Sequence, residues 1–147
     1  AEERPADDCV MCRLAAAPDA DEALVVARGG SAFVVLNAYP YTSGHLMVVV
    51  NRHEASLERL DPAEAAEVMG FLQWSVAALT RAYRPDGVNV GANLGAAAGA
   101  GVPGHLHVHV VPRWHADTNF MTTVASARVI PESLGETLAR VRAAWDG

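Results

Sequence analysis

The stretch His105-Leu106-His107-Val108-His109-Val110-Val111-Pro112 places three histidines at alternate positions of an apolar segment. Side chains two residues apart on a β-strand share a face, so this spacing predicts that the three imidazoles lie on one side of a strand. The intervening Leu and Val side chains would bury the opposite face in a core. We therefore predict a strand that displays a row of histidines, and this row is the first candidate for a functional site.

Histidine suits such a site because its unperturbed pKa of about 6.5 keeps both the neutral and the protonated form accessible near neutral pH. One imidazole can act as a nucleophile, a second as an acid and a third as a metal ligand. A lone histidine on such a face would more often be an ordinary core residue. Three in alternation, directly after a glycine-rich loop, favour a functional role instead.

Length and composition indicate one domain spanning residues 1–147, because half of the residues are hydrophobic and the chain is long enough to bury a sizeable core. We expect residues 1–8 to be flexible. They carry charge and no apolar leader segment, and no run approaches the ~20 apolar residues that span a bilayer. The expectation is a cytoplasmic protein without a membrane partner.

The formal net charge of -6 argues against non-specific binding to nucleic acid, which needs a basic surface. All 11 basic residues are Arg, so a P-loop lysine and a lysine-nucleotidyl intermediate are both excluded. An anionic substrate must therefore be captured locally, and the histidines are left as the candidate nucleophiles.

Apolar patterns predict five strands and two helices. A helix begins at Asp61, with Pro62 at its first position and Glu64 at its third. Its apolar stripe repeats at three- and four-residue steps and comprises Val68, Leu72, Val76, Leu79 and Tyr83. The second helix is expected over 131–145, and the strands over 24–27, 33–36, 45–50, 88–92 and 105–112. Because the early strands are joined by short turns, we predict an α+β protein with an antiparallel sheet of about five strands, one long helix and a C-terminal helix.

The loop 91–104 contains no charged residue and is dominated by Gly and Ala. Glycines allow conformations in which successive backbone amides converge on an anion, so the loop could hold a phosphate beside the histidines. The alternative is a flexible surface loop.

Two cysteines, Cys9 and Cys12, form a C-x-x-C pair. Such a pair is typical of a metal half-site or a redox pair, and the alternative is two ordinary reduced thiols. A rival use of the histidine strand is a zinc hydrolase, in which two alternating histidines hold a catalytic metal. That hypothesis requires an acidic ligand nearby, and Asp117 is the close candidate.

The order His-φ-His-φ-His-φ-φ, where φ is an apolar residue, resembles the histidine triad (HIT) superfamily of nucleotide hydrolases and transferases. The resemblance extends from Cys9 through Phe120. It includes the C-x-x-C pair, a Gly44-His45 strand eight residues before His53, and an Asn-x-Gly loop that leads to the triad. The resemblance implies a HIT-like fold that dimerises.

By this resemblance His107 attacks the α-phosphorus of a nucleotide and forms a covalent nucleotidyl-histidine. A neutral imidazole needs no proton removed before it attacks, which makes this role chemically reasonable. His109 would bind the scissile phosphate and assist the leaving group as a proton donor. Asn93 would contact the reacting region, Asn37 would bond the ribose hydroxyls, and His45 would support the hydrogen-bond network of the triad.

Relatives with a C-x-x-C pair hold a structural zinc, and the matching ligands here are Cys9, Cys12, His53 and His105. A Cys2His2 set is a closed tetrahedral site with no position left for water, so this metal would fasten the N-terminus to the histidine strand. We expect no organic cofactor.

Residues 35–49 and 109–114 look most like the bacterial diadenosine tetraphosphate phosphorylase and hydrolase branch. Where the hydrolase and phosphoramidase branches usually carry Gln and then Ser or Thr, this chain has Gly101 and Val102. The missing Gln leaves room for inorganic phosphate as the acceptor. Trp114 and Phe120 could stack on the second base or belong to a core or dimer interface, and Arg113 could pair with phosphate or with solvent.

The prediction is thus a homodimeric enzyme that cleaves dinucleoside polyphosphates. One alternative is a nucleoside phosphoramidase or another nucleotidyl transferase with the same histidine nucleophile. A second alternative, of another class, is a non-catalytic nucleotide-binding module.

Overall fold

The computed structural model describes residues 8–38, 43–115 and 132–145. The strands are β1 (Val25–Arg28), β2 (Ala32–Leu36), β3 (Leu46–Val50), β4 (Gly87–Gly91) and β5 (His107–Arg113). The α-helices are α1 (Val10–Ala16), α2 (Pro62–Tyr83) and α4 (Leu134–Trp145), and the short 3₁₀ turns are η2 (Leu57–Arg59) and η3 (Ala96–Ala98). The predicted α+β class is confirmed.

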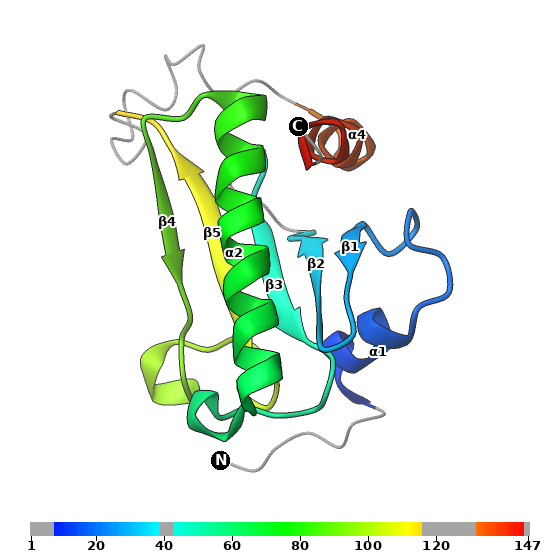
Figure 1. Ribbon diagram of the computed structural model, residues 1–147, viewed down its shortest axis with the longest axis vertical. Coiled ribbons are helices and arrows are strands. Elements are labelled where there is room, and N and C mark those ends of the chain that lie inside the picture. The colour runs from blue at the N-terminus through cyan, green and yellow to red at the C-terminus, as the bar shows by residue number, and fades with distance from the viewer. Residues whose placement is uncertain (1–7, 39–42, 116–131, 146–147) are drawn as a thin grey trace.

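The five strands form one antiparallel sheet in the order β1-β2-β3-β5-β4 (Figure 1). The tight turn after β1 makes a hairpin with β2, and β3 pairs with β2 over its full length. The strand that carries the histidines, β5, lies between β3 and the edge strand β4. On β5, His107 pairs with Val49 and His109 pairs with Met47.

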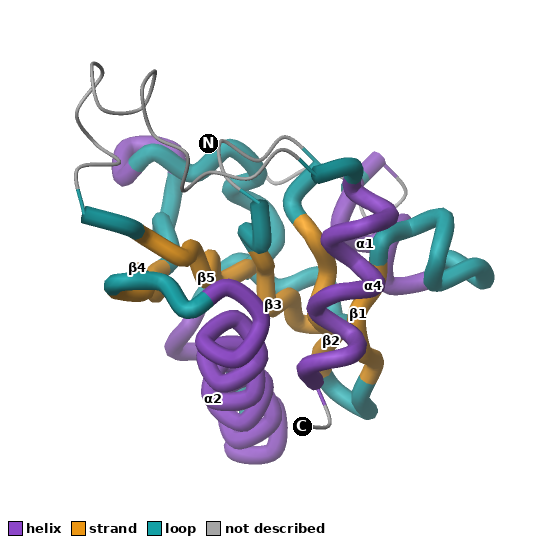
Figure 2. Tube along the Cα trace, turned by 90° about the horizontal axis from the view of Figure 1, so that it is seen from above, coloured by secondary structure: helices purple, strands orange, loops and turns teal. Residues whose placement is uncertain are grey.

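Apolar side chains on the two faces of the sheet form two separate clusters. On one face, Val48 and Val110 pack with residues of α2 and α4, including Leu79 and Val141. Figure 1 shows α2 lying along this face, and Figure 2 shows it from the end. On the other face, Val49 and Met47 pack with Phe33 and with residues of α1. Paired residues share a face, so His107 and His109 project on the α1 side, away from α2.

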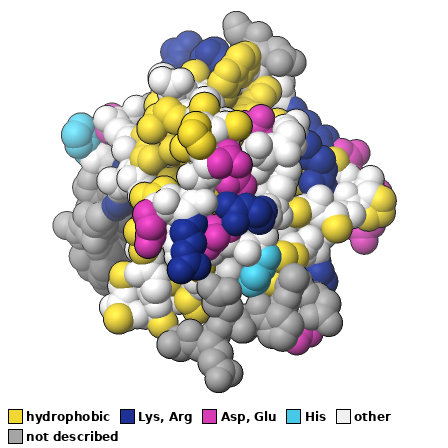
Figure 3. Space-filling view, turned by 60° about the horizontal axis from the view of Figure 1, so that its bottom comes forward, with side chains coloured by type: hydrophobic (Ala, Val, Ile, Leu, Met, Phe, Trp, Pro, Cys, Tyr) yellow, Lys and Arg dark blue, Asp and Glu magenta, His cyan; other side chains and the backbone are white. Residues whose placement is uncertain are grey.

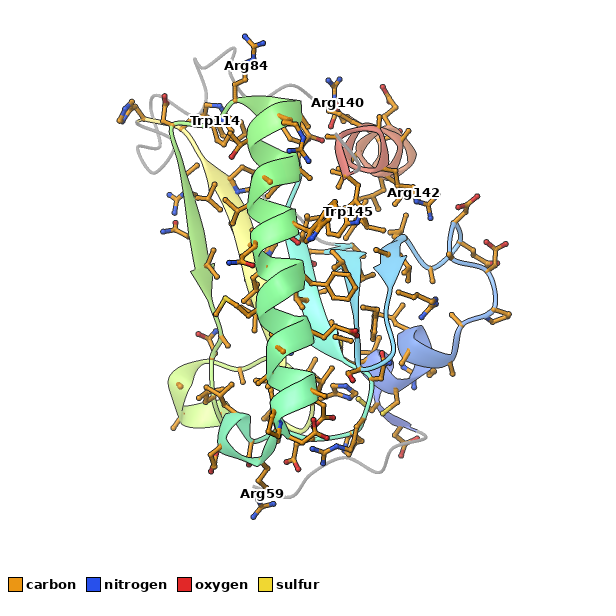
Figure 4. All side chains as sticks on the ribbon, viewed as in Figure 1. Arg59, Arg84, Trp114, Arg140, Arg142 and Trp145 are labelled. Atoms are coloured by element: carbon orange, nitrogen blue, oxygen red, sulfur yellow. The ribbon has the colours of Figure 1, made fainter. Side chains whose placement is uncertain are left out.

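Helix α2 begins as the sequence predicts. The Asp61 side chain accepts from the backbone of Glu64, and the Glu64 side chain accepts from the backbone of Asp61, which completes a capping box. The predicted apolar stripe faces the sheet, with Val68 and Leu79 buried. The helix ends at Arg84, which adopts a left-handed conformation with φ 48°. Its neighbour α4 docks through Trp145, which lies between the two helices in Figure 4.

The bounds of the predicted strands and of the C-terminal helix differ from the structure by one to three residues. The histidine strand begins at His107 rather than His105, because Leu106 donates its backbone N–H to the carbonyl of Glu54 in the loop after β3. The C-terminal helix begins at Leu134 rather than at 131. The strand β4 is shifted by one residue. The sequence analysis also missed α1, a helix of 7 residues, because so short a segment shows less than two turns of periodicity.

The end of the molecule seen in Figure 3 carries basic and acidic side chains side by side. One ion-paired cation of the protein is Arg52, whose guanidinium donates to Glu54 at 3.0 Å and to Glu64 at 2.8 Å. Because this exposed cation is paired with two carboxylates, it does not contribute to a basic surface of the kind that binds nucleic acid. Among the described residues, no helix is long and apolar enough to cross a membrane.

Candidate active site and metal centre

The side chains of His107 and His109 are half-buried on the α1 side of the sheet, with ring centroids 5.1 Å apart. The Nδ1 atom of His107 lies 2.8 Å from the carbonyl oxygen of His105. A carbonyl only accepts hydrogen bonds, so the His107 proton sits on Nδ1 and the lone pair of the neutral ring is on Nε2. The fold therefore presents His107 as a base or nucleophile through Nε2.

His109 has the opposite arrangement because His45 lies against it. The Nε2 atom of His45 is 2.9 Å from Nδ1 of His109, and Nδ1 of His45 is 3.1 Å from Nδ2 of Asn37. An amide nitrogen donates, so this chain of contacts runs from Asn37 through His45 to His109 and leaves the His109 proton on Nε2. Burial, with the neighbouring His109 charge, lowers the pKa of His45 to about 4. Burial and then the charge of His107 lower the pKa of His109.

A cavity of about 630 Å³ opens beside these two rings, which is the size range of small-molecule sites. It is lined by six residues that the sequence analysis named as site residues, which are Asn37, Asn93, Gly101, Val102, His107 and His109. Its other wall is apolar and includes Met11 and Leu14 of α1. The sequence analysis missed that wall because it did not predict α1.

The glycine-rich loop forms one edge of this cavity. It includes the η3 turn, and Gly95 and Gly99 both have positive φ, at 85° and 97°. Asn93 donates to the carbonyl of Gly99 at 3.4 Å, which folds the loop back on itself. Gly99 and Gly101 line the cavity, so the loop backbone faces the space beside the histidines. Phosphate binding by this loop stays a prediction.

Other residues singled out from the sequence lie elsewhere. His45 contacts His109 but does not line the large cavity. Trp114 follows the end of β5 and lies in Figure 4 at the same end of the molecule as Arg84, and it does not line the cavity either. Arg113 donates to the Asn89 side chain on β4 at 2.7 Å. Asp117 and Phe120 lie outside the described residues, so their predicted roles stay predictions.

A second cluster joins Cys9, Cys12, His53 and His105, whose ligand atoms all lie within 4.8 Å of one another. The Nδ1 atom of His105 is 3.4 Å from Sγ of Cys9 and 3.5 Å from Sγ of Cys12. The Nδ1 atom of His53 is 3.3 Å from Sγ of Cys12. Sulfur and nitrogen ligands of one tetrahedral zinc are separated by about 3.6 Å at the usual bond lengths, so these residues fit that metal.

The surroundings of the cluster support the same chemistry. His105 is 1% exposed, and its Nε2 donates to the carbonyl of Val50 at 2.6 Å, which leaves the Nδ1 lone pair facing the two sulfurs. Burial, and then Cys9, raise the pKa of the Cys12 thiol. A divalent cation would offset that cost by stabilising the thiolates. The cluster lies beside the cavity, because Val10 and Met11 between the two cysteines are lining residues.

The fold and these two histidine pairs define a class of α+β proteins with neighbouring histidines on one strand of an antiparallel sheet. A HIT domain family model matches residues 20–116, and the chain belongs to that family. The chain is 48% identical over 125 residues to AP-4-A phosphorylase of Mycobacterium tuberculosis, a match that covers 85% of this chain and 64% of that protein. The chain thus spans less than two thirds of that relative's length.

Two further similarities agree with the assignment. A bis(5'-nucleosyl)-tetraphosphatase (asymmetrical) of Schizosaccharomyces pombe is 32% identical over 87 residues, which are 59% of this chain and 46% of that protein. The crystal structure of a zinc-bound histidine triad family protein from Mycobacterium smegmatis superposes with a TM-score of 0.77. Its sequence is 27% identical, and the match covers 97% of this chain and 96% of that one. The predicted HIT fold is confirmed.

Proposed function

We propose that this protein cleaves dinucleoside polyphosphates, with diadenosine tetraphosphate as the model substrate, by transferring a nucleotidyl group to Nε2 of His107. The observation that carries the proposal is the pair of opposite tautomers at one cavity. His107 offers a lone pair and His109 offers an N–H, and an in-line displacement at phosphorus needs one of each. The similarity to the mycobacterial AP-4-A phosphorylase supports the substrate class.

The reaction would proceed in two displacements. In the first, the Nε2 lone pair of His107 forms a bond to the α-phosphorus, the bond to the bridging oxygen breaks, and ATP leaves with the electron pair. The N–H of His109 would stabilise the leaving phosphate oxygen by a hydrogen bond. In the second, an oxygen of inorganic phosphate attacks the same phosphorus, the N–P bond breaks, and the electron pair returns to His107. The products are ADP and ATP.

Phosphate is favoured over water as the acceptor. Gly101 and Val102 line the cavity and carry no polar side chain, so space remains beside His107 for a second anion. The glycine-rich loop would supply backbone amides to that anion. Transfer to water would instead give AMP and ATP.

The alternative of a phosphoramidase is disfavoured by the state of His109. An amine leaving group must receive a proton, whereas a phosphate leaves as an anion and needs only a hydrogen bond. Burial lowers the pKa of His109, so the neutral form predominates at neutral pH. A neutral donor of this kind suits the phosphate leaving group.

We further propose that Cys9, Cys12, His53 and His105 hold a structural zinc. Zinc bound there would cross-link the N-terminal segment to the ends of β3 and β5. It would not supply an activated water, because the protein would fill all four ligand positions. The Nδ1 atom of His53 is the nitrogen that faces the thiols, because it lies 3.3 Å from Sγ of Cys12.

We also propose that the protein is a homodimer, as the family resemblance implies. Support comes from the edge strand β4, whose outer backbone groups pair with no other described strand and whose Val90 is 48% exposed. Sedimentation equilibrium would give the mass directly. A monomer at all accessible concentrations would contradict this part of the proposal.

The deciding experiment is incubation with diadenosine tetraphosphate, with and without inorganic phosphate, followed by chromatographic separation of the nucleotides. ADP plus ATP that appear only with phosphate would support a phosphorylase. AMP plus ATP without phosphate would instead indicate a hydrolase. A parallel reaction with an adenosine phosphoramidate tests the alternative enzyme, and nucleotide binding without turnover of either substrate would favour the non-catalytic module.

A further inference from the structure

The contact between Asn37 and His45 controls which ring nitrogen of His45 carries the proton. The side-chain nitrogen Nδ2 of Asn37 lies 3.1 Å from Nδ1 of His45, and the Nε2 atom on the other side of that ring lies 2.9 Å from Nδ1 of His109. A neutral imidazole has one N–H and one lone pair. If Asn37 donates to Nδ1, the proton of His45 must be on Nε2 and must point at His109.

The same rule then applies to the next ring. His109 accepts at Nδ1, so its own proton is on Nε2, the nitrogen on the far side of the ring from His45. His109 lines the cavity, and a phosphate oxygen there can accept a hydrogen bond but cannot donate one. His109 can therefore donate a hydrogen bond to an anion in the cavity only in this tautomer. Asn37 determines the tautomer through the intervening ring of His45.

Within the part of the chain that the structure describes, Asn37 is the side chain that engages Nδ1 of His45. A small cavity behind the ring is lined by Asn37, His45 and the acidic Glu132. The Glu132 carboxylate accepts from the Tyr83 hydroxyl at 2.7 Å, and also from the Thr137 hydroxyl at 2.9 Å and the Arg140 guanidinium at 2.6 Å. The hydrogen bonds of the Glu132 carboxylate are thus made with side chains of α2 and α4. Among the described residues, His107 is the next titratable side chain in this row of histidines, and it lies on the other side of His109 from His45.

We propose that Asn37 is a positioning residue that fixes the direction of the hydrogen bonds through His45 and thereby places a proton on Nε2 of His109. The placement of the proton follows from the geometry alone, and its consequence for turnover rests on the function proposed above. This role is separate from any contact of Asn37 with ribose, because it acts on the histidines before substrate is present.

Substitution Asn37→Asp separates the two roles. Aspartate keeps oxygens that can accept from ribose hydroxyls but has no N–H, so it must accept from His45, and the proton of His45 moves to Nδ1. A neutral His45 would then accept from His109, whose Nε2 would lose its proton. The useful direction returns only when His45 is doubly protonated, which a carboxylate neighbour favours at lower pH.

The direct test is nitrogen NMR of the histidine rings in protein labelled with ¹⁵N-histidine, without substrate, at pH 8. In the wild-type protein we expect the protons of His45 and His109 on Nε2. In the Asn37→Asp variant we expect the proton of His45 on Nδ1, or both nitrogens protonated at lower pH. A proton on Nδ1 of His45 in the wild-type protein would overturn the proposal, and this outcome does not depend on activity or on the folding of any variant.

The kinetic test compares kcat and KM over a range of pH. For Asn37→Asp we expect kcat at pH 8 to fall about 100-fold, within the usual contribution of a positioned proton donor, and to recover partly as the pH is lowered. KM should change little. A variant that loses only affinity, with kcat and its pH profile unchanged, would reduce Asn37 to a ribose contact and overturn the proposal.

Gln73→Glu serves as the matched control, because it makes the same amide-to-carboxylate change at an exposed position of α2. Its kcat and ring-proton positions should equal those of the wild-type protein. If the wild-type protein turns over no dinucleotide at all, the proposed function fails while the NMR result still decides the proton placement.

Discussion

Two pairs of histidines, both contributed in part by one segment of the chain, have different environments and different chemistry. His53 and His105 lie against two thiols, and His105 is fully buried. His107 and His109 are half-buried and line an open cavity. Only one residue, Leu106, separates His105 from His107. Residue type therefore does not determine the role of these histidines, and their surroundings do.

The difference can be traced to which ring nitrogen a backbone carbonyl engages. The Nε2–H of His105 donates to the carbonyl of Val50, so the lone pair is on Nδ1, which faces the sulfurs. The Nδ1–H of His107 donates to the carbonyl of His105, so the lone pair is on Nε2. A carbonyl thus leaves Nδ1 available to the proposed metal in the first case and Nε2 available for the proposed attack on phosphorus in the second. Each pair can be disrupted separately, which makes the comparison testable.

The largest expected effect is that of His107→Ala. It removes the nucleophile, so turnover of diadenosine tetraphosphate should fall at least about 10⁴-fold, as when the nucleophile of other covalent catalysts is removed. Steady-state kinetics measure the loss, and mass spectrometry of the quenched wild-type reaction should detect a nucleotidyl adduct that the variant lacks. Metal content and melting temperature should change little.

His115→Ala is the control for that variant, because His115 is an exposed histidine beyond the end of β5. Its turnover should match that of the wild-type protein. A His107→Ala protein that retains turnover would sink the nucleophile assignment and remove the functional contrast between the two pairs.

Cys9→Ser addresses the other pair. Loss of one ligand should release the metal and cost about 3 kcal/mol, or a fall of about 6–12 °C in melting temperature for a chain of this size. Because Val10 and Met11 line the cavity beside His107, KM should also rise while the proposed His107 chemistry persists. Elemental analysis and calorimetry provide the measurements.

A chelator provides the internal control for the cysteine variant. It should lower the melting temperature of the wild-type protein to about that of Cys9→Ser and have no further effect on the variant. If the wild-type protein contains no metal and is indifferent to the chelator, the zinc proposal is wrong, and the cysteines are ordinary buried thiols.

The sequence predicted the sheet, the long helix and the polar side chains at the cavity, because alternation and capping act locally. Asp61, Pro62 and Glu64 specify the start of α2 by their own side chains. The row of three histidines was predicted only in part. Its first member, His105, lies before the strand because Leu106 bonds to Glu54, and such a long-range contact has no local pattern. Its place among Cys9, Cys12 and His53 was expected from the family resemblance. The α1 wall was missed for the related reason that tertiary packing, not periodicity, maintains so short a helix.

The smallest of these effects concerns Gly44, which supports the reactive pair by positioning His45. Gly44 has φ +86°, and an added Cβ would lie 3.0 Å from the Tyr83 ring and 3.2 Å from Leu79. Alanine there must adopt an unfavourable backbone conformation and displace a packed ring, so Gly44→Ala should cost about 2 kcal/mol and lower the melting temperature by about 4–8 °C. Turnover should fall because His45 shifts, while metal content should stay unchanged because the nearest ligand in the chain, His53, lies at the other end of β3 from this turn. Gly30→Ala is the matched control, since nothing lies within 4 Å of its added Cβ and its φ is not positive. If the two alanine variants have the same stability and turnover, the turn before β3 does not position His45, and the support for the reactive pair must come from Asn37 alone.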